Sequence, residues 1–164
     1  MKKTIFTLLM AVCFTVGYSQ LYNNGGTITV ESGATLVVEG DYTATNSGSM
    51  IIDGTVQVKG DFINTAGSIP DGSNGRLVFS GSTAQEISGA STTFYCAVEV
   101  NNASGVTLTA NDEVMDSTLF LTGGNLTLGN YDLTMANETV SGGSASHYIV
   151  TDGSGELKQV VAAS

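Results

Sequence analysis

The 164-residue chain has few of the residues on which most binding and catalytic sites depend. It contains five basic residues against 15 acidic ones, one proline, one histidine, two cysteines and no tryptophan. A formal charge of −10 argues against a nucleic-acid module and against binding to anionic membranes, because both need clustered lysine and arginine. Hydrophobic residues make up 41% of the chain and charged residues only 12%, which argues against intrinsic disorder and predicts one domain with a packed core.

The N-terminus has the pattern of a secretory leader. Two lysines precede an apolar run over residues 5–16, and Gly17 and Ser19 supply small residues just before Gln20. This pattern predicts a signal peptide over residues 1–19, cleaved after Ser19. No later stretch approaches the ~20 apolar residues of a membrane span. We therefore expect a secreted protein, extracellular or at the cell surface, without a transmembrane span.

Cleavage changes the charge and the cysteine count. Two of the five basic residues and one of the two cysteines lie in the leader, so the remaining 145 residues have a formal charge of −12 and only Cys96. An exported chain with one cysteine has no intramolecular disulfide to stabilise it. Cys96 lies in the apolar stretch 94–98 and is predicted to be a small buried hydrophobe.

Similar residues return about every 21 positions after the leader. The segment Val-Glu-Gly-Asp-Tyr at 38–42 returns as Val-Lys-Gly-Asp-Phe at 58–62. One apolar column then contains Leu36, Val56, Leu77, Val98 and Leu119. A second column links Val106 and Leu108 to Leu126 and Leu128, with Val150 expected to follow Leu128. Columns of this kind are typical of a solenoid, in which each coil stacks its residues on equivalent residues of the coil before it.

Within each repeat, apolar and polar residues alternate, as in residues 27–30, 55–58 and 125–128. Alternation with a period of two predicts short strands, and the glycine-containing pairs between the runs predict turns. The chain is therefore predicted to be all-β. We expect a parallel β-helix (β-solenoid) over residues 20–164 with about seven coils, right-handed by the usual crossover rule. A β-sandwich is the alternative.

The repeat also predicts several local features. Tyr42 and Phe62 should stack in the core, and glycines should occupy the corners, where left-handed backbone is easiest for them. Pro70 is expected in a loop at a corner, because a strand paired on both sides has no place for proline. Residues 113–116 are expected to form another irregular corner.

The leader ending in Ser19-Gln20, the two coils at 38–42 and 58–62 and the late segment 147–157 resemble secreted, repetitive, adhesin-like β-helix proteins of bacterial surfaces, often exported by the type IX route. The resemblance covers most of the chain after the leader. It implies a stalk or passenger module of a larger surface protein and provides no catalytic residues. Members usually continue into further β domains and a sorting domain, so we expect the C-terminal end to be truncated or to dock onto a partner.

Calcium is the first metal to consider, because Asp41 and Asp61 stand beside corner glycines and oxygen ligands suit this ion. The segments 71–75 and 152–156 are the best candidates. The nonapeptide of calcium-binding β-rolls is absent, however, and Asp-Gly pairs more often form simple turns. No metal or cofactor is therefore predicted, with calcium left open.

A carbohydrate-active enzyme or carbohydrate-binding module on the same scaffold is the main alternative function. A polysaccharide lyase needs a basic residue, and the only candidates after the leader are the dispersed Lys59, Arg76 and Lys158. A hydrolase needs paired carboxylates, for which the candidate pairs are Glu39 with Asp41 and Asp53 with Asp61.

Two further features indicate no activity. The column of Thr107 and Thr127 suggests ice binding, but the outward neighbours of the Leu36 column form no threonine ladder; they are Val37, Gln57, Val78, Glu99 and Phe120. His147 is the only histidine and cannot form a metal site alone. The sequence thus predicts a non-catalytic structural or adhesive β-solenoid, with surface glycans or other copies and domains of a longer surface protein as partners.

Overall fold

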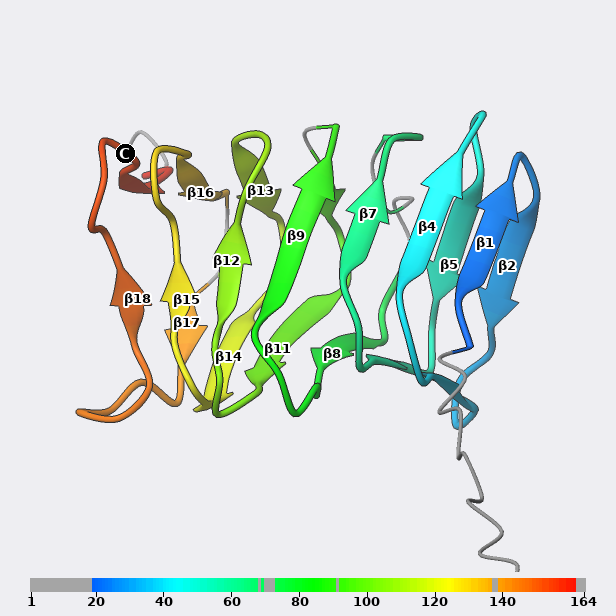
Figure 1. Ribbon diagram of the computed structural model, residues 1–164, viewed down its shortest axis with the longest axis horizontal. Helices are drawn as coiled ribbons and strands as arrows, with labels where there is room; N and C mark the ends of the chain where they lie inside the picture. Colours follow the sequence, from blue (N-terminus) through cyan, green and yellow to red (C-terminus); the bar gives the residue numbers. More distant parts are fainter. Residues whose placement is uncertain (1–18, 68, 70–72, 91, 137–138, 162–164) are drawn as a thin grey trace, which may run out of the picture.

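A computed structural model describes residues 19–67, 69, 73–90, 92–136 and 139–161 (Figure 1). The described chain is all-β, and its strands stack in parallel as a β-solenoid of about six turns. Each turn of about 21 residues contributes one strand to each of up to three sides. The predicted parallel β-helix is confirmed, and the β-sandwich is excluded.

The sides differ in length. The seven-stranded sheet contains β1 (Leu21–Asn24), β4 (Tyr42–Thr45), β7 (Phe62–Asn64), β9 (Gln85–Gly89), β12 (Val106–Leu108), β15 (Leu126–Thr127) and β18 (Ile149–Val150). The six-stranded sheet contains β3 (Thr35–Val38), β6 (Thr55–Val58), β8 (Arg76–Phe79), β11 (Ala97–Asn101), β14 (Leu119–Gly123) and β17 (Val140–Ser141). The third side consists of two separate sheets: β2 (Thr27–Val30) with β5 (Ser49–Ile52), and β10 (Thr93–Phe94) with β13 (Glu113–Met115), β16 (Leu133–Met135) and β19 (Leu157–Gln159).

The direction of winding can be followed in Figure 1. The strands of the seven-stranded sheet face the viewer and point upward, β5 passes behind β4, and successive turns advance from right to left. An ascending front, a descending back and an advance to the left together describe a right-handed coil, as the crossover rule predicts.

The register of the strands confirms the predicted columns. Leu36 pairs with Val56, and the same column continues through Leu77, Val98 and Leu119. Tyr42 pairs with Phe62, and Thr107 pairs with Thr127. The column that was expected to join Leu128 to Val150 is shifted by one residue, because Leu126 pairs with Ile149 and Thr127 pairs with Val150. The chain before β18 contains a short loop, bridged between Ser144 and His147, and these extra residues move the register.

The described residues form about six turns where the chain length divided by the period suggests seven, and two of these turns are longer than the others. Phe62 pairs with Ile87, 25 positions later, and Leu126 pairs with Ile149, 23 positions later. The first long turn has no strand on the third side among the residues that the structure describes. There Ile69 is buried and donates its N–H to the carbonyl of Thr93. The loop predicted around Pro70 lies partly outside the described residues.

The prediction of an irregular corner at 113–116 was wrong, because Glu113, Val114 and Met115 form β13. Glu113 and Met115 point inward and are buried, and Val114 between them is half-buried. The strand pattern was hidden in the sequence because an acidic residue occupies an inward position.

Glycine is required at the corners where two turns approach closely. Gly124 has a φ of +78°, and a Cβ atom there would lie only 1.7 Å from the carbonyl oxygen of Asn102 in the preceding turn. A side chain at this position would therefore force the two turns apart, as the corner role predicted for glycine implies.

The core contains a cluster of four aromatic rings in the first half of the rod. The ring centroid of Phe62 lies 5.1 Å from Tyr42, 6.1 Å from Phe79 and 5.8 Å from Phe94. All four side chains are buried. These are the largest fully buried side chains among the described residues, and they come from all three sides.

Phe62→Ala should lower the free energy of unfolding by about 3–5 kcal/mol, because it leaves a cavity at the centre of this cluster. Chemical denaturation followed by circular dichroism measures the loss. The control is Val37→Ala in β3, whose side chain is 42% exposed; it should change stability by less than about 0.5 kcal/mol. Equal effects of the two substitutions would contradict the packing described here.

Candidate functional site

The acidic residues that the sequence singled out gather at corners of the rod. Glu39, Asp41 and Asp61 line one hollow of about 660 Å³ together with Lys59, Ser80 and Ser82, and we call it the corner hollow. Asp53 lies apart from them, in a second hollow of about 420 Å³ that also includes Arg76 and Phe120. The structure therefore brings Glu39 and Asp41 together but separates the other candidate pair, Asp53 and Asp61, between two hollows.

Each of these carboxylates already binds a group of the protein. Both oxygens of Glu39 accept hydrogen bonds from Lys59 Nζ, at 2.8 and 2.9 Å. Asp41 Oδ1 accepts the backbone N–H of Asp61, and Asp61 Oδ1 accepts that of Glu86, both at 2.9 Å. Asp53 Oδ1 accepts the N–H of Asn74 at 3.2 Å. Three of these bonds join an acid to the backbone of the next turn, so the acids act as acceptors where the chain leaves one sheet for another.

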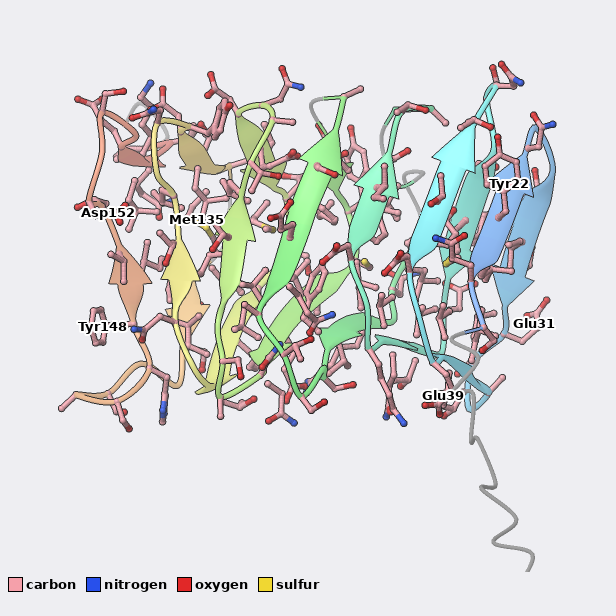
Figure 2. All side chains as sticks on the ribbon, in the orientation of Figure 1. Tyr22, Glu31, Glu39, Met135, Tyr148 and Asp152 are labelled. Atoms are coloured by element: carbon pink, nitrogen blue, oxygen red, sulfur yellow. The ribbon has the colours of Figure 1, made fainter. Side chains whose placement is uncertain are left out.

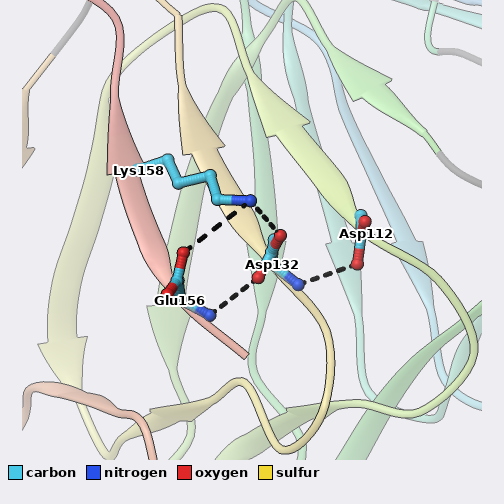
Figure 3. A network of polar contacts seen from close by, with 4 residues as sticks. All are labelled: Asp112, Asp132, Glu156 and Lys158. Carbon is cyan, nitrogen blue, oxygen red and sulfur yellow. Dashed lines mark hydrogen bonds and ion pairs between the residues drawn. The ribbon is translucent and has the colours of Figure 1, made fainter. Parts of the chain in front are cut away.

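The same arrangement recurs at the C-terminal end of the rod (Figure 3). Asp112 Oδ1 accepts the N–H of Asp132, and Asp132 Oδ1 accepts the N–H of Glu156, both at 2.8 Å. Lys158 Nζ binds Asp132 Oδ2 and lies 3.9 Å from Glu156 Oε2. The bond from Lys158, followed by the N–H of Glu156, lowers the pKa of Asp132, and Asp132 in turn raises the pKa of Lys158.

Asp132→Asn keeps an acceptor oxygen for Glu156 but removes the ionic partner of Lys158, whereas Asp132→Ala removes both. At neutral pH we expect the thermal midpoint to fall in the order wild type, Asn variant, Ala variant. The folded pKa of Asp132 is lowered, so its stabilisation is complete above the unfolded pKa and is lost as the pH falls through the folded one. The gap between wild type and Asp132→Asn should therefore close in acid. Asp152→Asn, at the same end of the rod (Figure 2), is the control, and a gap that persists in strong acid would contradict the assignment.

Neither calcium candidate has the arrangement of a metal site in the part of the chain that the structure describes. Asp71 and Gly72 lie outside it, and Ser73 is buried with its Oγ accepting the N–H of Ile52 at 3.1 Å. Residues 152–156 pack on the preceding turn, where Asn130 Oδ1 accepts the N–H of Ser154 at 3.3 Å. Among the described residues, no group of three or more His, Cys, Asp or Glu could hold a metal ion.

The three basic residues considered for a lyase lie on different turns, and each is paired with an acid. Lys59 binds Glu39, Lys158 binds Asp132, and Arg76 Nη1 lies 2.7 Å from Glu99 Oε2. The guanidinium of Arg76 also lies 4.3 Å from the centre of the Phe120 ring, two turns further along the six-stranded sheet. The structure therefore assembles no basic cluster from these three residues.

The remaining sequence candidates have ordinary surroundings. Thr107 stacks between Glu86 and Thr127, and Val150 follows Thr127, so these positions form no threonine ladder. His147 Nδ1 lies 3.2 Å from the hydroxyl of its neighbour Ser146. Burial raises the pKa of the Cys96 thiol to about 12, so this cysteine stays protonated, as expected of a buried hydrophobe.

Buried polar side chains at the inner corners are a feature that the sequence analysis missed. Gln85 is buried and uses both ends of its amide: Oε1 accepts from Gly81 at 2.8 Å and from Asn102 at 3.0 Å, and Nε2 donates to the carbonyls of Val58 and Gly60. This fully paired amide joins three successive turns. The signal in the sequence is an amide residue at an inward position of the alternating pattern.

A second buried network contains the acid of β13. Asn64 Nδ2 donates to Thr92 Oγ1 at 3.3 Å, and the N–H of Thr92 donates to Glu113 Oε2 at 2.7 Å. Burial raises the pKa of Glu113 to about 8, against the opposing effect of the bond from Thr92, and the nearby charge of Asp112 raises it further. Glu113 is therefore mostly protonated at neutral pH.

Glu113 should make stability depend on pH. Because its folded pKa lies above its unfolded value, the folded state holds a proton that the unfolded state has lost between about pH 4.5 and pH 8. Stability should fall as the pH rises through this range, by about 5 kcal/mol at most. Glu113→Gln should flatten the slope, measured by denaturant unfolding at several pH values, with Glu86→Gln on an exposed position of β9 as the control. A wild-type slope that survives in Glu113→Gln would show that another group is responsible.

Comparison of this chain with protein-family models, with curated proteins and with solved structures gave no match. No helix among the described residues is long and apolar enough to cross a membrane. The function is therefore inferred from the contacts described above.

Proposed function

We propose that this protein is a secreted, non-catalytic β-solenoid that serves as a structural and adhesive rod at a bacterial cell surface. The observation that carries the proposal is the role of the corner acids. Asp41, Asp53 and Asp61, three of the four acids considered for a hydrolase, each accept a backbone N–H of the next turn, and Asp132 does the same near the C-terminal end. Their carboxylates stabilise the stack of turns, which is the role expected in a scaffold.

The dimensions and the surface support this role. About six turns at ~4.8 Å per paired strand make a rod on the order of 30 Å long. Its outward positions include stacked hydroxyl residues, such as Thr35 with Thr55 and Thr107 with Thr127. Such pairs place hydrogen-bonding groups of adjacent turns side by side on the surface, and the net negative charge favours solubility.

The sequence supports the location. The predicted leader over residues 1–19 directs export, and the resemblance to adhesin-like solenoids suggests a bacterial surface reached by the type IX route. In this proposal the rod spaces or presents other parts of a surface protein, and its partners are surface glycans or further domains.

Carbohydrate binding or cleavage on the same scaffold is the second candidate, and the corner hollow is the observation that favours it. Ser80 lines this hollow, and its buried Oγ is the one buried side-chain polar atom without a hydrogen-bond partner among the described residues. Glu39 and Asp41 stand at the same hollow. A glycosidase would need one of these acids to be free to donate a proton, whereas Glu39 is ion-paired and Asp41 accepts from Asp61.

Two measurements test the proposal. In bacteria that express the protein, mass spectrometry should find a mature N-terminus at Gln20, and protease treatment of intact cells should remove the protein from the outer surface. The purified protein should release neither reducing ends nor unsaturated sugars from a panel of polysaccharides. Sugar release that disappears in Glu39→Gln but not in Asp152→Asn, at the other end of the rod (Figure 2), would establish the enzyme instead, and a cytoplasmic, unprocessed chain would overturn the surface role.

A further inference from the structure

The sheets on all three sides end at the same turn at each end of the rod. β18, β17 and β19 are the outermost strands at the C-terminal end, and β1, β3 and β2 are the outermost strands at the N-terminal end (Figure 1). An outermost strand has a row of backbone N–H and C=O groups on its free edge and is a template for another strand. Each end of the described rod therefore presents three such edges.

The last turn exposes residues that belong to core columns. Val140 pairs with Leu119, Ile149 with Leu126 and Leu157 with Leu133. The three earlier leucines are fully buried, whereas Val140 is 38% exposed, Leu157 is 45% exposed and Ile149 is half-buried. These three side chains occupy inward positions, and no further turn covers them among the described residues. We call them the tail face.

The first turn also leaves residues of the core columns partly exposed. Leu21, Ile28 and Leu36 are register partners of the core residues Tyr42, Met50 and Val56. They are only partly buried, and Ile28, Val30 and Leu36 line an apolar hollow of about 290 Å³ at this end. We call Leu21, Ile28 and Leu36 the head face.

We propose that the tail face of one copy binds the head face of a second copy, so that the rods join head to tail. A second copy is the expected partner because the turns within one rod already stack in this way. Every strand pair is parallel, and each turn stacks its columns on those of the turn before it. A second copy in the same orientation would continue all three sides by placing β1 on β18, β3 on β17 and β2 on β19. The tail face and the head face differ, so the contact is heterologous and can propagate into longer rods.

Charge limits this association at low ionic strength. Glu31 and Glu39 lie at the head end and Asp152 lies at the tail end (Figure 2), where Glu156 directly precedes β19. Like charges would approach each other in the joint, and salt screens such exposed charges at distances beyond ~10 Å at 0.1 M and ~3 Å at 1 M. Association should therefore strengthen as salt is added, as expected for an apolar and backbone-paired contact between acidic ends.

The test measures the assembly state of the purified protein by light scattering and electron microscopy, at about 0.05 M and about 0.5 M salt. We expect particles of one width whose lengths are multiples of a single rod, with more of the long ones at high salt. Leu157→Lys blocks the tail face and Ile28→Lys blocks the head face, so each variant alone should remain monomeric. Ser141→Lys and Val37→Lys place the same charge on outward positions of the same end turns and should assemble like wild type.

Mixing the two blocked variants isolates the head-to-tail geometry. The Ile28→Lys protein retains its tail face and the Leu157→Lys protein retains its head face, so the mixture should form pairs and nothing longer. If Ile28→Lys does not fold by circular dichroism, Leu157→Lys is added to wild type. It should shorten the rods, because its head face binds the end of a rod and its blocked tail face prevents further growth.

Three results would overturn the proposal: wild type that is monomeric at both salt concentrations, blocked variants that assemble like wild type, or a mixture of folded blocked variants without pairs. The proposal extends the rod function and fails separately from it. Surface location and the absence of sugar release can hold while the protein stays monomeric, and enzymatic activity would leave the assembly result unchanged.

Discussion

Parallel pairing between successive turns is the interaction on which the rest of this structure depends. Once β1 pairs with β4 and β4 with β7, every residue of a turn lies over its equivalent in the next. An inward residue must therefore fit the same kind of residue above and below it, which explains columns such as the one through Leu36 and Leu119. The stack also makes each turn dependent mainly on its two neighbours, as in other solenoids.

Corners are where this pairing fails, and polar side chains replace it there. At the outer corners Asp41, Asp61 and Asp132 accept backbone N–H groups that the sheets leave unpaired. At the inner corners the side-chain amides of Gln85 and Asn102 donate to the backbone carbonyls of Val58 and Thr83 inside the core. Much of the polar inventory of the chain thus completes the hydrogen bonding of the backbone, and the acids contribute solubility at the same positions.

The sequence predicted the columns and the strand order well because period and alternation are properties of consecutive residues. The sequence predicted the structure poorly where a polar residue occupies an inward position. Glu113 reads as a solvent-exposed corner acid, yet it points inward, where Thr92 donates to it across a buried network. The corner hollow could not be foreseen, because Glu39, Asp61 and Ser82 meet only after three turns are stacked. The two long turns could not be foreseen, because an average period does not show which turn carries the extra residues.

The interrupted third side gives the rod an uneven mechanical strength. Between β5 and β10 the described residues continue only the seven-stranded and six-stranded sheets without a break, and single contacts, such as the N–H of Ile69 to the carbonyl of Thr93, replace a paired strand. In the proposed role as a surface tether, the rod would be pulled along its length. Among the described residues, only the seven-stranded and six-stranded sheets would carry that load without a break through this turn.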